Sequence, residues 1–445
     1  IFDNAFRNSD GTTRILNIYD QTTGEKYDKQ SIDEYIRLNE DLSGGTFSYD
    51  NAPGVDNIMH GTDVSYIAAG SLGVAYEADI IAVKMGYSIN NQFPRTTSLM
   101  DAIDYIIRKA IEYRKPVAVN ISYGCNYGAH NGNTLLESFI DDISKSYRCV
   151  ICVGSGNEAD KAIHFGGIIN TGQVQTAYLS VGEYQSAIDI QIWKNYWDTI
   201  DVMLINPRGE QIGIITEGRI NRYETYNTEI ITLLGEPSPY NIYQEIYINL
   251  IPKTDYILSG IWQIVLMAGS IRAGEYNIWL PSSQALGYAT AFNNPTADGT
   301  ITIPATARNC IAVGAYNAYT NSYAAFSGRG FDNSIRNVNA GVKPEITAPG
   351  VDISIARQRG NDITYRNVTG TSYAVPVVTG AAALLMQWGI VMGNDRFMYG
   401  EKLKAALING SKPVGLVGIT RNDNQPDPRT GWGAVCLKNT LNKIL

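Results

Sequence analysis

The first and last thirds of the chain alternate between short apolar runs and longer segments with apolar residues at helical spacing. Residues 98–114 place Ile103, Ile107 and Ala110 on one side of a helix, and Pro116 ends this pattern. A strand, a helix and a strand follow, at residues 117–122, 134–147 and 149–154. Strands and helices in alternation are typical of a parallel sheet with helices on its faces. These parts of the sequence therefore predict an α/β fold.

The pattern changes between about residues 171 and 293, where apolar and polar residues alternate in short runs. These runs are residues 188–193, 201–205, 211–215, 247–251, 260–266 and 276–280. Evenly spaced short strands without helices between them are typical of a β-sandwich or jelly roll. We therefore expect an α/β domain in two parts, residues 1–171 and 294–445. The inserted β-sandwich, of jelly-roll type, is expected at residues 172–293.

Composition narrows the possible functions. The 445 residues carry 43 acidic and 35 basic side chains, and no block of Lys and Arg stands out, which argues against a nucleic-acid partner. No apolar run reaches the roughly 18 residues that a membrane span needs, so no span is expected. The chain begins at Ile1 and not at Met, so we expect that a segment has been removed upstream.

Two of the five cysteines, Cys149 and Cys152, form a C-x-x-C pair, a spacing that occurs in metal and redox sites. Here the pair lies within an apolar run of strand character, and no second cysteine pair is near. We therefore expect buried, free thiols, and neither a metal site nor a cofactor.

Three segments carry candidate chemistry. His60 precedes Gly-Thr at the start of a small-residue helix, Asn157 ends a glycine-rich turn, and Ser372 opens a long apolar helix. Singly, they could be a surface histidine, a turn residue and a helix N-cap. Together, they supply what a serine nucleophile requires, namely a base to take its proton and donors to hold the oxyanion.

These segments resemble the motifs of the subtilisin-like serine proteases, in which the serine motif reads Gly-Thr-Ser-x-Ala-x-Pro. Residues 370–376 match that motif, although Tyr373 and Val377 stand where Met and His are commoner. Further matches lie at residues 120–124, 311–315, 325–330, 343–350 and 431–433. The resemblance implies a subtilisin-like parallel sheet flanked by helices, and it covers most of the chain outside the β insertion.

The same resemblance implies roles for individual residues. His60 would be the general base, Ser372 the nucleophile and Asn157 the oxyanion donor of a catalytic triad. The substrate-binding residues would be Ser122, Tyr123, Gly124, Ser155 and Gly156.

The third member of such a triad is an aspartate at the end of a buried strand, well before the histidine. Asp20 ends an apolar run, but Gln follows it. Residues 5–22 are instead similar to the clostridial germination proteases of the Csp group, in which this stretch follows the catalytic aspartate and a jelly roll is inserted. We therefore expect the aspartate upstream of Ile1, on an N-terminal prodomain or separate fragment. Two alternatives stay open: Asp20 could be the catalytic aspartate, or the chain could be a Ser–His dyad enzyme or an inactive enzyme.

The resemblance implies a serine endopeptidase that cleaves protein substrates through an acyl-enzyme. Within the Csp group, it implies activation of a spore cortex-lytic pro-enzyme, in a spore-associated or secreted bacterial protein. A general secreted subtilase is one alternative, and a pseudoprotease that acts as a binding or signalling scaffold in germination is another. Carbohydrate binding by the insertion is a third, through Trp193, Trp197, Trp262 and Trp279, although their alternation favours core packing.

Overall fold

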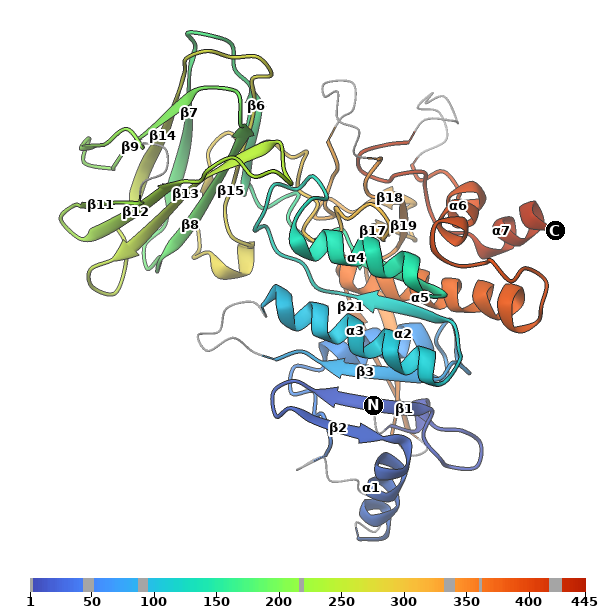
Figure 1. Ribbon diagram of the computed structural model, residues 1–445. Coiled ribbons are helices and arrows are strands. Elements are labelled where there is room, and N and C mark those ends of the chain that lie inside the picture. The colour runs from blue at the N-terminus through green and yellow to red at the C-terminus, as the bar shows by residue number, and fades with distance from the viewer. Residues whose placement is uncertain are drawn as a thin grey trace.

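The computed structural model describes residues 3–42, 52–86, 95–215, 220–331, 341–359, 362–415 and 426–445. Figure 1 shows an α/β body and a separate lobe of antiparallel strands that joins one end of it.

The α/β body contains a parallel sheet with the order β4, β5, β17 and β19, to which β18 adds an antiparallel edge. These strands are β4 (Val117–Ile121), β5 (Cys149–Gly154), β17 (Ile311–Asn317), β18 (Ser322–Tyr323) and β19 (Ile346–Pro349). All six residues of β5 are buried, as expected for a central strand covered on both faces. Cys149 and Cys152 lie within it as buried free thiols, which confirms the expectation from the sequence.

Helices cover both faces of this sheet (Figure 1). The helices that contact the sheet are α3 (Thr96–Glu112), α4 (Leu135–Ser146), α5 (Thr371–Met386) and α6 (Gly400–Gly410). α2 (His60–Ala69) and η3 (Gln387–Val391) contact α5, and α7 (Leu437–Ile444) contacts α6. The predicted helices correspond to α3, α4 and α5 and are confirmed. The segment Thr371–Val391 is long and apolar enough to cross a membrane, but most of it is buried here as the core helix of the body.

A second, smaller sheet has the order β2, β1, β3. Its elements are η1 (Asn4–Phe6), β1 (Ile15–Asp20), β2 (Glu25–Asp28), α1 (Lys29–Leu42) and β3 (Ile80–Lys84), and the hairpin β20 (Ile353–Arg359) and β21 (Asp362–Val368) packs beside it. β1 and β3 are parallel. Within the described ranges, β3 pairs only with β1, and β4 pairs only with β5. The parallel sheet of the body is therefore interrupted between β3 and β4.

The strands between residues 164 and 292 form two antiparallel sheets around a common apolar core. One contains β6 (His164–Ile168), β8 (Ile188–Asn195), β11 (Ile220–Glu224), β12 (Thr228–Leu234), β13 (Tyr243–Pro252) and β15 (Glu275–Trp279); the other contains β7 (Val174–Val181), β9 (Ile200–Ile205), β10 (Gln211–Ile212), β14 (Gly260–Ala268) and β16 (Ala291–Phe292). The ends of this unit meet, because the Phe292 amide donates to the Ala162 carbonyl at 2.9 Å. β6 precedes the expected boundary at residue 172 but belongs to the first sheet.

The tryptophans of this unit serve mainly in packing. Trp262 and Trp279 are fully buried, and Trp193 packs partly buried against the same core, whereas Trp197 is exposed. A short segment after β15, η2 (Ser283–Ala285), leads back towards the α/β body.

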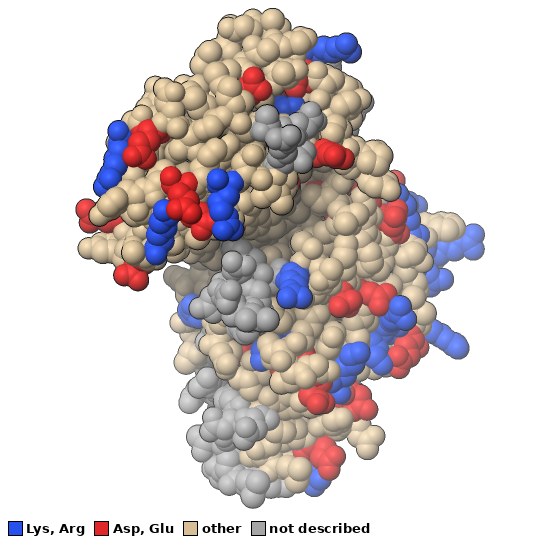
Figure 2. All heavy atoms as spheres, turned by 60° about the vertical axis from the view of Figure 1, so that its left-hand side comes forward, with Lys and Arg blue, Asp and Glu red and all other residues tan. Residues whose placement is uncertain are grey.

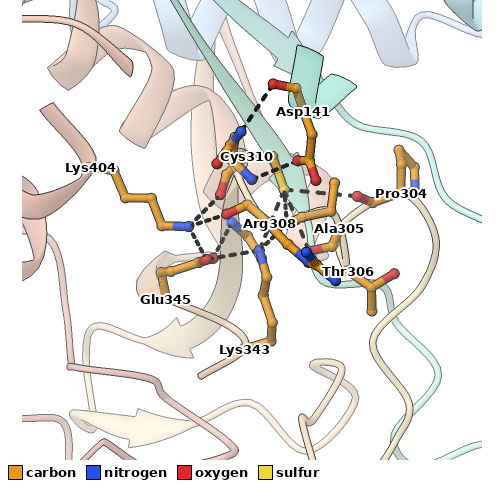
Figure 3. Close-up of polar contacts among 12 residues, drawn as sticks. Asp141, Pro304, Ala305, Thr306, Arg308, Cys310, Lys343, Glu345 and Lys404 are labelled. Atoms are coloured by element: carbon orange, nitrogen blue, oxygen red, sulfur yellow. Dashed lines mark hydrogen bonds and ion pairs between the residues drawn. The ribbon is translucent and has the colours of Figure 1, made fainter. Parts of the chain in front are cut away.

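A buried ion cluster links α6 to the parallel sheet (Figure 3). The carboxylate of Glu345, just before β19, pairs with Lys404 of α6 and with Lys343 at 2.8 Å. It also accepts the backbone amide of Ala312 in β17 at 2.7 Å. Glu345 is 4% exposed, so its charge depends on both lysines to offset the loss of water.

Replacement of Glu345 by Ala should lower the free energy of unfolding by about 3–5 kcal/mol, because it leaves two lysines at the buried site without their carboxylate. Urea unfolding would measure the change. The control is Glu401→Ala on the exposed side of α6, which should change stability by less than about 0.5 kcal/mol. Equal stabilities for the two variants would contradict the role given to the cluster.

Candidate active site

His60 is the first residue of α2, and the carboxylate of Asp56 builds this helix start. Asp56 accepts the backbone amides of Met59 at 2.9 Å and of Thr62 at 2.8 Å, and also the Thr62 hydroxyl. These bonds satisfy donors that have no partner within the helix. They also hold the backbone on both sides of His60, so that its imidazole lies at the rim of a cavity.

Asn157 follows β5 and is bound to the start of α5. Its Oδ1 accepts the Thr371 amide at 2.9 Å and the Thr371 hydroxyl at 3.0 Å. Because Oδ1 is engaged by two donors, the NH₂ group is the part of the amide left for the cavity, which Asn157 also lines. This is the orientation that an oxyanion donor requires.

Ser372 is the second residue of α5, and its backbone is tied to the end of β4. The Ser122 hydroxyl donates to the Ser372 carbonyl at 2.8 Å, and the Asn120 amide donates to the Ser122 hydroxyl at 3.0 Å. Ser372 lines the same cavity as His60 and Asn157. The structure therefore brings the three residues of the sequence hypothesis to one cavity, at the carboxyl end of the parallel strands.

The imidazole of His60 is half-buried, and its ring makes a T-shaped contact with the ring of Tyr373, with 5.7 Å between the ring centroids. Burial lowers the pKa of His60 below its usual value, and the charges of Asp56 and Asp63 offset only part of this effect. The imidazole is therefore neutral at pH 7, as a general base must be. Among the described residues, neither of its ring nitrogens makes a hydrogen bond.

Asp20 lies at the end of β1 and is occupied by other partners. Its carboxylate accepts the Thr22 amide at 2.9 Å and pairs with Lys84 at 3.1 Å. Burial opposes the charge, but the bonds from Thr22 and Lys84 hold the pKa of Asp20 below its usual value. Within the described part of the chain, no hydrogen bond joins Asp20 to His60. The aspartate that would support His60 stays a prediction.

The cavity has a volume of about 1490 Å³ and extends from the candidate residues into the interruption of the sheet. All of β3 and all of β4 line it from two sides. The other walls come from α2, α3 and α5, with mainly small and aliphatic side chains: Val64, Ala68, Leu99, Ala102, Ile103, Ile106, Ala110, Gly380, Ala383 and Leu384. This space is mainly apolar and lies between two strand edges that have no partner among the described residues, which is the environment that a further strand would fill.

Elsewhere, the surface has no large area of one charge in the view of Figure 2, where acidic and basic side chains are interspersed. A large basic patch of the kind that nucleic-acid-binding proteins use is absent from that face.

A family model for subtilases matches residues 22–238 and 273–433. The chain belongs to the subtilase family. The protease CspB of Clostridium perfringens has a similar solved structure, with a TM-score of 0.87 and 33% sequence identity over 99% of this chain and 89% of that chain. The inserted antiparallel sheets are thus part of a subtilase architecture found also in a Csp protein.

Shorter matches join this subtilase to proteins of other organisms. The subtilase-type proteinase RRT12 of Saccharomyces cerevisiae is 33% identical over 128 residues, which are 28% of this chain and 23% of that protein. Subtilisin-like protease 10 of Arthroderma otae is 33% identical over 120 residues, or 27% of each protein. The matched segments thus span about a quarter of these relatives.

One feature of the site was missed by reasoning from the sequence. The capping role of Asp56 depends on a turn between Asp56 and Thr62, and the spacing Asp-x-x-x-x-x-Thr does not show it. A gap in the core was expected where the aspartate-bearing strand would lie, and the cavity lies beside β3 and β4. β3 reads Ile80-Ile-Ala-Val-Lys84, an apolar run typical of a strand covered on both faces, yet all five residues are partly exposed.

We expect His60 to titrate below 6.5 in the folded chain, because burial disfavours its charged form more than the two nearby aspartates favour it. The ring resonances in NMR spectra at a series of pH values would measure this, and the variant His60→Gln assigns the signal. The buried His130, whose pKa burial lowers to about 4, serves as an internal reference. A midpoint for His60 above 6.5 would contradict the electrostatics described here.

Proposed function

We propose that this chain is the larger part of a serine endopeptidase, with Ser372 as nucleophile and His60 as general base. The observation that carries the proposal is the meeting of His60, Ser372 and Asn157 at one cavity, with Asn157 bound to the residue before Ser372. Membership of the subtilase family and the likeness to the CspB protease support it.

In the proposed reaction, the Ser372 hydroxyl oxygen attacks the carbonyl carbon of a peptide bond while His60 takes the hydroxyl proton. The amide NH₂ of Asn157 and the backbone N–H of Ser372 hold the negative oxygen. His60 then gives its proton to the amine that leaves when the C–N bond breaks. Water, deprotonated by His60, hydrolyses the acyl-enzyme and restores the serine. The substrate backbone would run along Ser122, Tyr123 and Gly124 on one side, with Ser155 and Gly156 on the other.

We further propose that the catalytic aspartate lies on a strand outside residues 1–445, and that this strand occupies the space between β3 and β4. An imidazole that gains a proton during attack needs an acceptor at its second nitrogen. Asp20 is paired with Lys84, Asp63 pairs with Arg366, and Asp56 is engaged by the start of α2. A parallel strand between β3 and β4 would join the two sheets, and its carboxyl end would lie near His60.

A fusion protein tests this proposal. A six-residue apolar strand that ends in Asp is joined to the N-terminus of the chain through a long Gly/Ser linker, and this protein is called the Asp fusion. The fused strand should pair with β3 and β4 and raise the pKa of His60. Labelling of Ser372 by a fluorophosphonate should then be about 10³–10⁴-fold faster than in a fusion ending in Asn, which cannot stabilise the imidazolium. Labelling rates by mass spectrometry and NMR titration of His60 provide the two measurements.

The controls separate the alternatives. Ser372→Ala should abolish labelling, and Asp20→Asn should leave the labelling rate of the Asp fusion unchanged within about twofold. If the unfused chain is labelled as fast as the Asp fusion, the proposal of an aspartate outside residues 1–445 is wrong. If the strand is protected from hydrogen exchange but neither fusion labels, the chain is a pseudoprotease scaffold and the endopeptidase proposal fails.

Asn157→Ala should lower kcat of the Asp fusion by about 10²–10³, because one oxyanion donor is lost. KM should change little, since the amide acts mainly on the transition state. Asn157→Asp keeps the shape of the side chain but faces the oxyanion with a carboxylate oxygen, so it should be at least as slow. Peptide hydrolysis assays would measure both. A rise in KM at constant kcat would contradict the oxyanion role.

The finer assignment is a proposal that rests on the likeness to the Csp group and to CspB. We propose that the substrate is a protein, namely a cortex-lytic pro-enzyme of a spore, and that the protein is spore-associated or secreted. Cleavage of such a purified pro-enzyme by the Asp fusion at one defined bond, and no cleavage by its Ser372→Ala variant, would support the assignment.

A further inference from the structure

Three exposed tyrosines lie on neighbouring loops at one end of the inserted sheets. Tyr184 lies between β7 and β8, Tyr256 between β13 and β14, and Tyr288 between η2 and β16. Their exposed fractions are 72%, 44% and 95%. The rings of Tyr184 and Tyr256 make a T-shaped contact, with 5.3 Å between the ring centroids. We call these three side chains the tyrosine surface.

Hydrogen bonds hold the three loops together. Gln185 is buried, its Oε1 accepts the Gly287 amide at 2.6 Å, and its carbonyl accepts the Ile257 amide at 2.9 Å. The Gly182 amide donates to the Thr290 hydroxyl at 3.0 Å. The loops therefore form one connected end of the inserted unit, and the exposed tyrosines stand on a backbone that is fixed in place.

Two of these loops contain an unfavourable backbone conformation. Tyr184 has a φ of 65°, and Ala289, next to Tyr288, has a φ of 64°. A left-handed conformation is uncommon for a residue with a bulky side chain, and it destabilises the folded state. Packing of Tyr184 does little to offset this, because most of its side chain is exposed. Such conformations are concentrated at sites that bind ligands, which supports a binding role for this end.

The tyrosine surface adjoins the cavity of the candidate active site. Ala285 of η2 lines this cavity together with Ser372. The Ser283 amide donates to the carboxylate of Glu158 at 3.1 Å, which fixes η2 beside the cavity. Tyr288 follows Ala285 by three residues, so the chain between them spans at most about 11 Å. A polypeptide bound at the cavity can therefore extend onto the tyrosine surface.

The charges of the same loops are acidic. Glu183 and Asp255 are exposed, and each directly precedes one of the tyrosines. Within the described ranges, no salt bridge joins either carboxylate to a basic side chain. Lys253, on the loop that contains Asp255, pairs instead with Glu224 at 2.9 Å. The tyrosine rings are thus accompanied by two negative charges that the described residues do not balance.

An adjacent turn shows which group suits such a ring. The guanidinium of Arg208 lies over the ring of Tyr226, 4.4 Å from its centroid. This turn touches the β13–β14 loop, because the Lys253 amide donates to the Asn227 carbonyl at 2.9 Å. A guanidinium is planar and charged, so it can stack on a tyrosine and at the same time donate to a carboxylate.

We propose that the tyrosine surface, with Glu183 and Asp255, binds an arginine side chain of the protein substrate at a distance from the cleaved bond. This inference rests on the proposed function, because it takes the adjoining cavity as the place of cleavage. The guanidinium stacks on the tyrosine rings, and the two carboxylates balance its charge. The substrate class is thus a protein with an arginine outside the residues that flank the cleaved bond.

A binding experiment tests the surface without turnover. The full chain with ¹³C-labelled tyrosine rings is titrated with N-acetylarginine amide, and with N-acetylcitrulline amide as the uncharged analogue of the same shape. The arginine compound should shift the ring signals of the tyrosine surface in NMR spectra, and its Kd should be about three- to tenfold lower than that of the citrulline compound. Tyr→Leu variants at the three positions assign the signals.

Three variants separate stacking from charge. Tyr184→Leu should abolish the preference for arginine over citrulline, and so should the double variant Glu183→Gln with Asp255→Asn, which keeps all the rings. The matched control is Tyr240→Leu, which removes an exposed tyrosine from the β12–β13 loop and should leave the preference unchanged. Circular dichroism checks that each variant is folded.

A kinetic experiment tests the link to the substrate. The Asp fusion cleaves a series of peptides in which one arginine is moved residue by residue away from the cleaved bond, and citrulline replaces it in the control series. At the spacing that reaches the tyrosine surface, arginine should lower KM about three- to tenfold, with kcat unchanged within about twofold, because the contact is the same in the ground state and the transition state. Tyr184→Leu should remove this difference.

The outcomes distinguish this inference from the proposed function. Equal affinity for the arginine and citrulline compounds would overturn the arginine site, and so would shifts of the same tyrosine signals by an N-acetylglucosamine oligomer alone. Selective binding of arginine without cleavage of any peptide would support the surface and contradict the endopeptidase. Cleavage with a KM that does not depend on arginine at any spacing would support the endopeptidase and overturn the surface as a substrate site.

Discussion

Backbone N–H and C=O groups inside a sheet need partners, and the facing edges of β3 and β4 lack them within the described residues. The arrangement of the site depends on this constraint. α2 and α5 pack on each other on one side of the interruption, where Gly380 lets the backbones approach so closely that a Cβ there would lie 3.0 Å from the Ala68 carbonyl oxygen of α2. His60 and Ser372 begin these two helices. The same interruption therefore sets the place of the base and of the nucleophile, and no described residue provides an acceptor for the imidazole.

Much of the fold could be predicted because its signals are local. The helix at Thr96–Glu112 has an apolar face and ends before Pro116, and the strand at Cys149–Gly154 is a continuous apolar run. The strands β11 and β12 were not predicted. β11 is a poorly buried strand that pairs with β12 alone within the described ranges, so burial imposes a weak pattern on its sequence. The exposed Trp197 was likewise expected in the core, because alternation along a strand does not extend to the turn after it.

The candidate site was predictable as a set of residue types, but its details depend on contacts between distant segments. Asn157 and Thr371 are 214 positions apart, and only the packed fold shows that Oδ1 is engaged and the NH₂ group faces the cavity. Sequence reasoning thus identified the reacting groups, and the structure identifies what surrounds them.

The meeting of Ala162 with Phe292 has a consequence for how the body assembles. β5 and β17 are paired, but Cys152 and its partner Ile311 are 159 positions apart, and closing so long a loop is entropically costly and slow. Once the antiparallel sheets have formed, their two ends lie side by side, so the chain between β5 and β17 behaves as two short connections around a rigid unit. Folding of the inserted sheets before the parallel sheet would convert a distant pairing into a nearly local one. The folded insertion would thus hold the ends of β5 and β17 close together and favour their pairing at the centre of the domain that it interrupts.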